Sequence, residues 1–170
     1  VMRYKFPDPE DQASLAHTFQ ATTEKFSQRP FLHFEDEMWT YGHTNKAANS
    51  LARYFISTGV KHGDRVVLFM ENRPSFVIAL LALNKIGAIG VLINTSLTGD
   101  PLVHCINSSD SVKCIVGAER ADALEDVLDQ INITQQEDFL WAEDTSQYSL
   151  PDWAIDLKAQ LDLSDDQNLE

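Results

Sequence analysis

Few residue patterns in this 170-residue chain could carry chemistry. It has neither a GxxxxGK[ST] phosphate loop nor a GxGxxG dinucleotide loop. Gly87 and Gly90 lie at an expected helix-to-strand turn, whereas a dinucleotide loop needs a strand-to-helix turn. The run from Asn94 to Asp100 does follow an expected strand, and its backbone amides could bind an anion. With one glycine and no nearby lysine, this run is more typical of a connecting loop.

Histidines and cysteines show no catalytic or metal-binding spacing. The histidines are scattered at His17, His33, His43, His62 and His104. None is spaced with Cys, Asp or Glu as metal ligands are. His104 and Cys105 are adjacent, but neighbours on a helix point in different directions, which does not suit a nucleophile and its base. Cys105 and Cys114 are too few for a disulfide framework and indicate small core residues.

One expected helix carries an acidic stripe, made of Asp122, Glu125, Asp126 and Asp129. Such a stripe is more often a solvated face than a metal site. From residue types and spacing alone we therefore expect no catalytic residue and no metal site, and we assign no cofactor-binding residue.

The net charge of −13 is unevenly distributed. Residues 1–118 hold 11 basic and 11 acidic side chains, whereas residues 119–170 hold 2 basic and 15 acidic ones. Because the acidic segment repels phosphate backbones, we expect no nucleic-acid partner. A solvated face with a loose end explains this segment more simply than an acidic interaction surface.

The first third of the chain predicts two helices around a hairpin. A helix is expected over residues 11–27, and a hairpin over residues 31–41 with its turn at Glu35 and Asp36. Thr40 is a good N-cap for a second helix that runs to about residue 58. Gly59 then stands where a left-handed glycine ends a helix.

The middle of the chain alternates buried strands with helices. Continuous apolar runs predict strands buried on both faces, over residues 65–70, 89–93 and 112–116. Between them lie an almost wholly apolar helix over residues 74–86 and a short helix over residues 101–107. We therefore expect an α/β fold, a parallel sheet with helices on both faces, with the hairpin apart or at an edge.

The last third is expected to continue the same domain. Residues 120–131 predict a helix, residues 139–141 a short strand, and Pro151 the start of a last helix. The expected organisation is an α/β core over residues 1–118, an acidic helical continuation over 119–163, and a disordered tail over 164–170. Leu169 and Glu170 form a dipeptide that often precedes a vector-encoded tag.

Two blocks of the sequence carry a family resemblance. The first is a Thr-Tyr turn followed by Asn-x-x-Ala-x-x-Leu-Ala, from Thr40 to Ala52. The second is Leu-x-Lys-x-Gly-Ala ahead of an apolar strand, from Leu83 to Ala88. Together they resemble the N-terminal region of the adenylate-forming (AMP-binding) enzymes over about residues 30–120. His43 departs from the pattern, because a Glu there often closes a reciprocal capping box.

Two further stretches are closest to one branch of that family. They run from Gly63 to Val77 and from Gly90 to Ile106. Both resemble the fatty-acid-transport-protein and very-long-chain acyl-CoA synthetase branch, with the carnitine-CoA ligases as the near alternative. The resemblance implies that the parent enzyme uses ATP, magnesium and coenzyme A to convert a fatty acid to its acyl-CoA, AMP and pyrophosphate.

The resemblance also implies that this chain omits the chemistry. The family's Ser/Thr/Gly-rich phosphate loop, its adenine and ribose motifs and its catalytic lysine would all follow the present C-terminus. We therefore expect an N-terminal fragment that is inactive alone and holds no cofactor. Its partners would be the remainder of the parent chain and, in the parent, a fatty-acid substrate.

Further expectations concern the association and the location of the protein. An exposed cut face would favour self-association. With no secretory signal, a cytoplasmic location is expected, and a peripheral membrane association of the parent stays open. The rival hypotheses are a stand-alone binding or scaffold module without catalysis, and a small nucleotide- or flavin-binding protein.

Overall fold

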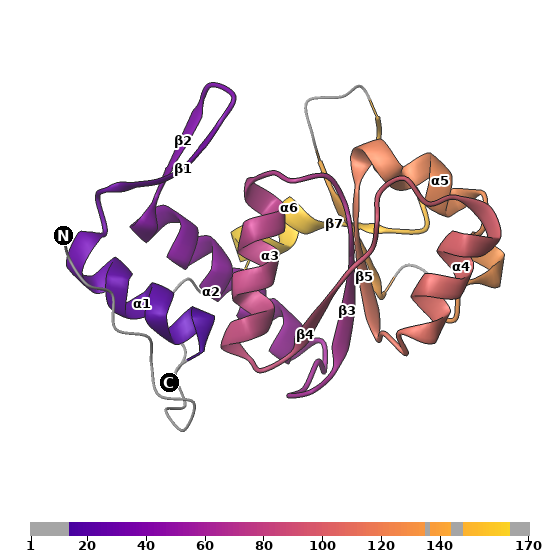
Figure 1. The fold of residues 1–170 in the computed structure, drawn as a ribbon, viewed down its shortest axis with the longest axis horizontal. Helices are drawn as coiled ribbons and strands as arrows, with labels where there is room; N and C mark the ends of the chain where they lie inside the picture. The colour runs from indigo at the N-terminus through magenta and orange to yellow at the C-terminus, as the bar shows by residue number, and fades with distance from the viewer. Residues whose placement is uncertain (1–13, 135–136, 144–147, 164–170) are drawn as a thin grey trace.

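A computed structural model of the chain describes residues 14–134, 137–143 and 148–163 (Figure 1). Its elements follow in the order α1 (Leu15–Phe26), β1 (Pro30–Phe34), β2 (Glu37–Thr40), α2 (Tyr41–Ser57), β3 (Arg65–Phe69), α3 (Pro74–Lys85), β4 (Ile89–Leu92), α4 (Gly99–Ser108), β5 (Lys113–Gly117), η1 (Ala118–Arg120), α5 (Ala121–Glu125), η2 (Leu128–Gln130), β6 (Phe139–Ala142), β7 (Ile155–Asp156) and α6 (Leu157–Leu163).

The main sheet has five strands in the order β4-β3-β5-β6-β7, and every neighbouring pair is parallel. The three strands predicted from apolar runs are adjacent and parallel, as expected, with β3 between the other two. The prediction that each is buried on both faces is wrong for β4, because β4 is an edge strand in which Ile89 and Leu92 are exposed. The chain passes from β3 outward to β4 and then returns to β5 on the other side of β3. The strand order therefore reverses between β3 and β5, which makes this point the topological switch of the sheet.

Helices cover both faces of the sheet, which confirms the predicted fold class. Figure 1 shows α3 and α6 on one side of the strands and α4 and α5 on the other. The alternation along β3 explains why: Val66 and Leu68 join one core, whereas Val67 and Phe69 join the other. A strand that is buried on both faces has apolar side chains at successive positions, so its sequence is a continuous apolar run.

The helix α3 lies between the sheet and the pair α1 and α2 (Figure 1). Pro74 occupies its first turn, where a missing N–H costs nothing. Leu81 and Leu83 are almost wholly buried in the core that α2 and α3 share with the sheet. The all-round apolar character of this segment is thus explained by neighbours on more than one side.

The hairpin β1–β2 is a separate antiparallel sheet that projects from the body of the molecule (Figure 1). At its base Thr40 caps α2, and its side chain accepts a hydrogen bond of 3.1 Å from the His43 amide. The His43 ring stacks on Trp39 at 4.2 Å between ring centroids. His43, which lacks the carboxylate of a capping box, therefore supports the hairpin through its ring. Gly59 ends α2 at φ 88°, as expected.

The last third differs from its predicted course. Residues 120–131 form no continuous helix, since α5 ends at Glu125 and the short 3-10 turn η2 follows. The stretch after Pro151 first adds the strand β7 and only then enters α6. The short strand predicted over residues 139–141 is confirmed as β6, whereas β7 is a second strand of this segment that was not predicted. The predicted tail over 164–170 and the start of the predicted first helix lie outside the described residues.

Candidate functional site

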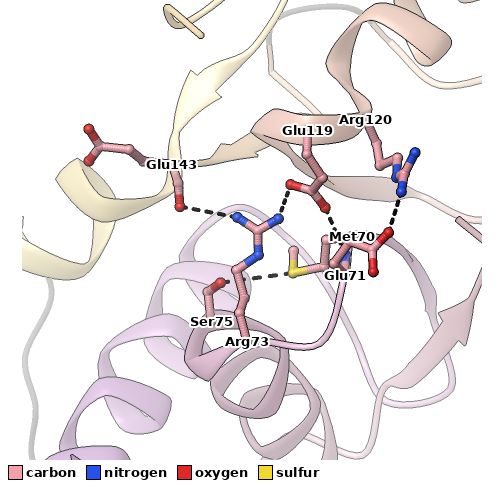
Figure 2. A network of polar contacts seen from close by, with 7 residues as sticks. All are labelled: Met70, Glu71, Arg73, Ser75, Glu119, Arg120 and Glu143. Carbon is pink, nitrogen blue, oxygen red and sulfur yellow. Dashed lines mark hydrogen bonds and ion pairs between the residues drawn. The ribbon is translucent and has the colours of Figure 1, made fainter. Parts of the chain in front are cut away.

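Charged residues gather at the carboxyl edge of the sheet, directly after three of its strands. Glu71 and Arg73 follow β3, Glu119 and Arg120 follow β5, and Glu143 follows β6. Figure 2 shows the side chains of Glu71, Arg73, Glu119 and Arg120 together at the switch point between β3 and β5, whereas Glu143 reaches them through its backbone carbonyl and its carboxylate points away. Open α/β sheets bind their ligands at this edge, so the cluster is the first place to look for a site.

The Arg73 guanidinium is the centre of this cluster. One of its amino groups forms an ion pair with the Glu119 carboxylate, and the other donates to the Glu143 carbonyl oxygen at 3.4 Å (Figure 2). The Arg73 side chain is only 8% exposed and that of Glu119 only 19%. A partly buried cation is thus neutralised by the protein itself, and it joins the ends of β3, β5 and β6.

A second pair lies on the outer side of the first. The Glu119 carboxylate accepts the Glu71 amide at 2.7 Å, and the Glu71 carboxylate pairs with Arg120. Arg120 donates a hydrogen bond to the Glu71 carboxylate, and this bond is the largest cause that lowers the pKa of Glu71. The positive charges of Arg120 and Arg73 lower this pKa further. The two pairs therefore form one connected network rather than separate surface contacts.

Gly117, the last residue of β5, leaves room for this network. A Cβ at this position would overlap the Glu119 carboxylate and the Arg73 guanidinium. Its backbone has the extended conformation that any residue adopts, so the requirement is for space rather than for a left-handed turn. We call the set of Glu71, Arg73, Glu119 and Arg120 the carboxyl-edge clamp.

The clamp occupies the switch point of the sheet, where a ligand of an open α/β sheet would sit. The Arg73 guanidinium is directed to protein acceptors, and Glu119 would repel a phosphate placed beside it. In the described residues, no group of three His, Cys, Asp or Glu side chains could hold a metal ion. The arrangement is suited to bracing strand ends and offers neither a nucleophile nor a metal-binding set.

Beside the clamp lies an open cleft of about 500 Å³, between the hairpin, the start of α3 and α6. Its apolar lining includes Trp39, Ile78, Leu157 and Leu161. Carboxylates and two cations form the charged part of the lining: Glu35, Glu37, Glu71, Glu119 and Glu143 with Arg73 and Lys158. The cleft therefore combines apolar walls with a predominantly negative rim.

The amino edge of the sheet holds another buried ion pair. Lys113 begins β5, is 3% exposed, pairs with Asp138 and donates to the Glu137 carbonyl oxygen at 3.1 Å. Tyr54 lies beside this pair, and burial followed by the negative charge of Asp138 raises its pKa. Lys113 thus joins β5 to the start of β6 at the amino edge, and Arg73 joins the ends of strands at the opposite, carboxyl edge.

The structure brings none of the sequence candidates together into a site. Asn94 bonds to the Ser96 amide at 2.9 Å within its own loop, in keeping with a connecting role. The four acids of the predicted stripe are all exposed. Cys114 is fully buried, which raises the pKa of its thiol, whereas Cys105 is only half-buried.

Sequence reasoning missed the clamp, although charged residues directly after two buried strands were a usable signal.

Comparison with known proteins identifies the family. A family model described as AMP-binding enzyme matches residues 19–166. The chain therefore belongs to the AMP-binding enzyme family, as the sequence blocks indicated.

Individual relatives narrow the branch. Long-chain fatty acid transport protein 6 of Homo sapiens is 26% identical over 166 residues, which cover 96% of this chain and 26% of that protein. Medium/long-chain-fatty-acid--CoA ligase FadD6 of Mycobacterium tuberculosis is 34% identical over 116 residues, 68% of this chain and 19% of the ligase. The chain is thus similar to the branch expected from its sequence, and it spans about a quarter or less of these relatives.

Solved structures share the fold. The anthranilate CoA ligase AuaEII in complex with anthranoyl-AMP superposes with a TM-score of 0.84 at 16% identity, over 93% of this chain and 29% of that one. The N-terminal domain of FACL13 from Mycobacterium tuberculosis gives a TM-score of 0.73 at 21% identity, over 92% and 37%. The sheet and its helices thus match the N-terminal domain of CoA ligases.

Proposed function

We propose that this chain is the N-terminal part of an ATP-dependent fatty acyl-CoA ligase. The observation that carries the proposal is the 34% identity to a fatty-acid–CoA ligase over 116 residues, within a family match that extends over residues 19–166. In that reaction a fatty carboxylate oxygen attacks the α-phosphorus of ATP and displaces pyrophosphate. The coenzyme A thiolate then attacks the acyl carbonyl carbon and displaces AMP.

Within this proposal the chain positions the domain and does not perform the chemistry. Stabilising the phosphoryl charge needs donors, cations or a metal around the phosphates. The described residues provide no metal-binding group, and the clamp engages its two arginines with carboxylates. We propose that the rest of the parent protein binds ATP, magnesium and coenzyme A, and that the chain alone is inactive.

The test of this function uses the complete polypeptide encoded by the source gene. Its reading frame should carry a Thr-Ser-Gly-Thr-Thr-Gly-like run soon after Asp166. The purified protein should catalyse pyrophosphate exchange that depends on a fatty acid and should release AMP when coenzyme A is added. A reading frame without such a run, or a protein without exchange across a series of fatty acids, would favour a binding or scaffold module.

Two further proposals concern location and association. We propose a cytoplasmic parent protein, with peripheral membrane association as the alternative. Separately, no helix in the described parts of the chain is long and apolar enough to cross a bilayer. We also propose that the isolated chain self-associates, because Ile89 and Leu92 on the edge strand β4 are 49% and 57% exposed. Light scattering should show a mass that grows with concentration, whereas a monomer at high concentration would refute the association.

A further inference from the structure

We propose that the cleft beside the carboxyl-edge clamp binds a short polypeptide segment in which lysine or arginine residues alternate with apolar ones. The inference goes beyond the proposed ligase function and does not depend on it. It rests on the shape, lining and charge of the cleft.

The walls of the cleft suit apolar side chains. Trp39 is half-buried and held in place, because its indole N–H donates to Glu37 at 2.9 Å and its ring stacks on His43. Across from the hairpin, α6 contributes the buried Leu157 and the half-buried Leu161. A fixed aromatic ring is the kind of anchor that dominates binding interfaces, because little entropy is lost on binding.

The rim of the cleft suits cations. Five carboxylates line it, and three of them already face cations, because Glu71 pairs with Arg120 beside the cleft and two others face the two cations of the lining. Arg73 pairs with Glu119, and Lys158 lies 3.9 Å from Glu143. In the described part of the chain, the exposed Glu35 carboxylate forms no ion pair, and that of Glu37 accepts only from Trp39. The excess negative charge attracts a cationic segment and repels fatty carboxylates and phosphates.

The size of the cleft points to a segment rather than a single ion. A volume of about 500 Å³ lies in the range of ligand-binding clefts and accommodates several side chains. The opening runs between two elements far apart in sequence, the hairpin and α6, so an extended segment could contact both.

The experiment titrates the 170-residue chain with an end-blocked Lys-Leu-Lys-Leu-Lys-Leu peptide at low salt. Affinity is measured by calorimetry, and tryptophan emission reports the location. Trp141 and Trp153 are each 5% exposed and lie in the core between the sheet and the helices α4 and α5. A change in emission therefore identifies Trp39. We expect saturable binding with an emission change that the Trp39→Phe variant lacks.

Two matched double variants separate the cleft from the general charge of the chain. Glu35→Gln with Glu143→Gln should raise the Kd about five- to tenfold, since two rim charges are removed. Asp122→Asn with Glu125→Gln removes the same charge from exposed positions on α5 and should leave the Kd within about twofold. All four positions are exposed, so both variants should keep the thermal midpoint of the parent chain.

Three results would overturn the proposal. They are equal weakening by the two double variants, equal binding of a Glu-Leu-Glu-Leu-Glu-Leu peptide, and the absence of saturable binding. The first would show general attraction to an acidic chain, and the second would show apolar contact alone.

Discussion

The two edges of the parallel sheet hold their charges in different ways. At the amino edge, Lys113 and Asp138 form a single ion pair between β5 and β6. At the carboxyl edge, two ion pairs are linked through the Glu71 amide and join the ends of three strands. The carboxyl edge also opens onto the cleft that we propose as a binding surface.

The difference between the two edges shows that the usual position of a ligand site can hold residues that serve another purpose. In an open α/β sheet the carboxyl edge at the switch point is the usual place of a ligand. Here that place is occupied by Arg73 and Glu119, whose charges satisfy each other. The chain therefore keeps the location typical of a binding fold but uses it to fix the strand ends.

The largest expected effect comes from removing the centre of the clamp. Arg73→Ala would leave the Glu119 carboxylate partly buried without its cation, so the free energy of unfolding should fall by about 3 kcal/mol. Urea unfolding measures the loss. Arg120→Ala is the matched control, because its pair is more exposed, with side chains 31% and 52% exposed, and should contribute about 1 kcal/mol. Equal losses in the two variants would contradict a buried centre.

A smaller loss is expected when the space for the clamp is filled. Gly117→Ala should destabilise the chain by about 1–3 kcal/mol, because the added methyl displaces the Arg73–Glu119 pair. In the Arg73→Ala background the same change should cost much less, and a double-mutant cycle measures this difference. If the two costs simply add, Gly117 is required for some other reason.

The amino edge should tolerate the loss of its cation better. Lys113→Met keeps the apolar stem in the core, and Asp138, with a side chain 26% exposed, can regain water. We expect a loss of about 1–2 kcal/mol in urea unfolding. A loss as large as that of Arg73→Ala would mean that the two edges depend equally on their ion pairs.

The smallest expected effect concerns the loss of folding stability at acid pH. The folded-state pKa of Glu71 lies below its ordinary value of 4.5, so its contribution is present above pH 4.5 and is lost as the pH falls through the folded-state value. Glu71→Gln should therefore flatten the decline of the urea midpoint below pH 4.5. An unchanged decline would show that the outer pair adds nothing to acid stability.

The sequence predicted the centre of the fold because its signals there are redundant. Apart from the charged first residues of β3 and β5, the strands β3, β4 and β5 have no charged or polar side chain, and the helices between them have proline or glycine near their ends. Thr40 and Gly59 act at the two ends of α2 as their residue types indicate. Local and long-range preferences agree in this region, which is why the predicted parallel arrangement is confirmed, whereas the predicted burial of β4 is wrong because its edge position depends on long-range pairing.

The last third was harder because its spacing fits two structures. Ala121, Leu124 and Val127 are three residues apart, a period that suits a 3-10 helix as well as an α-helix, and all three are buried. Trp153, Ile155 and Leu157 alternate with a period of two, which is typical of a strand, but Pro151 favoured a helix start. The strand β7 exists because β6 is available as a partner, and a single segment cannot reveal that.

The clamp and the cleft lay beyond sequence reasoning for a similar reason. Arg73 and Glu119 are 46 residues apart, and only the parallel pairing of β3 and β5 brings them together. The family resemblance located the Met-Glu-Asn-Arg-Pro segment but gave no partner for its arginine. The cleft in turn needs the hairpin and α6, whose relative position depends on the packing of α2.

We propose that this chain braces a ligase domain whose nucleotide site is formed by the rest of the parent protein. Calorimetric titration of the isolated 170-residue chain with MgATP at millimolar concentration tests the claim most directly. The account predicts only the heat of dilution, because no described group surrounds a phosphate. Saturable ATP binding would contradict it and would favour a small nucleotide-binding protein.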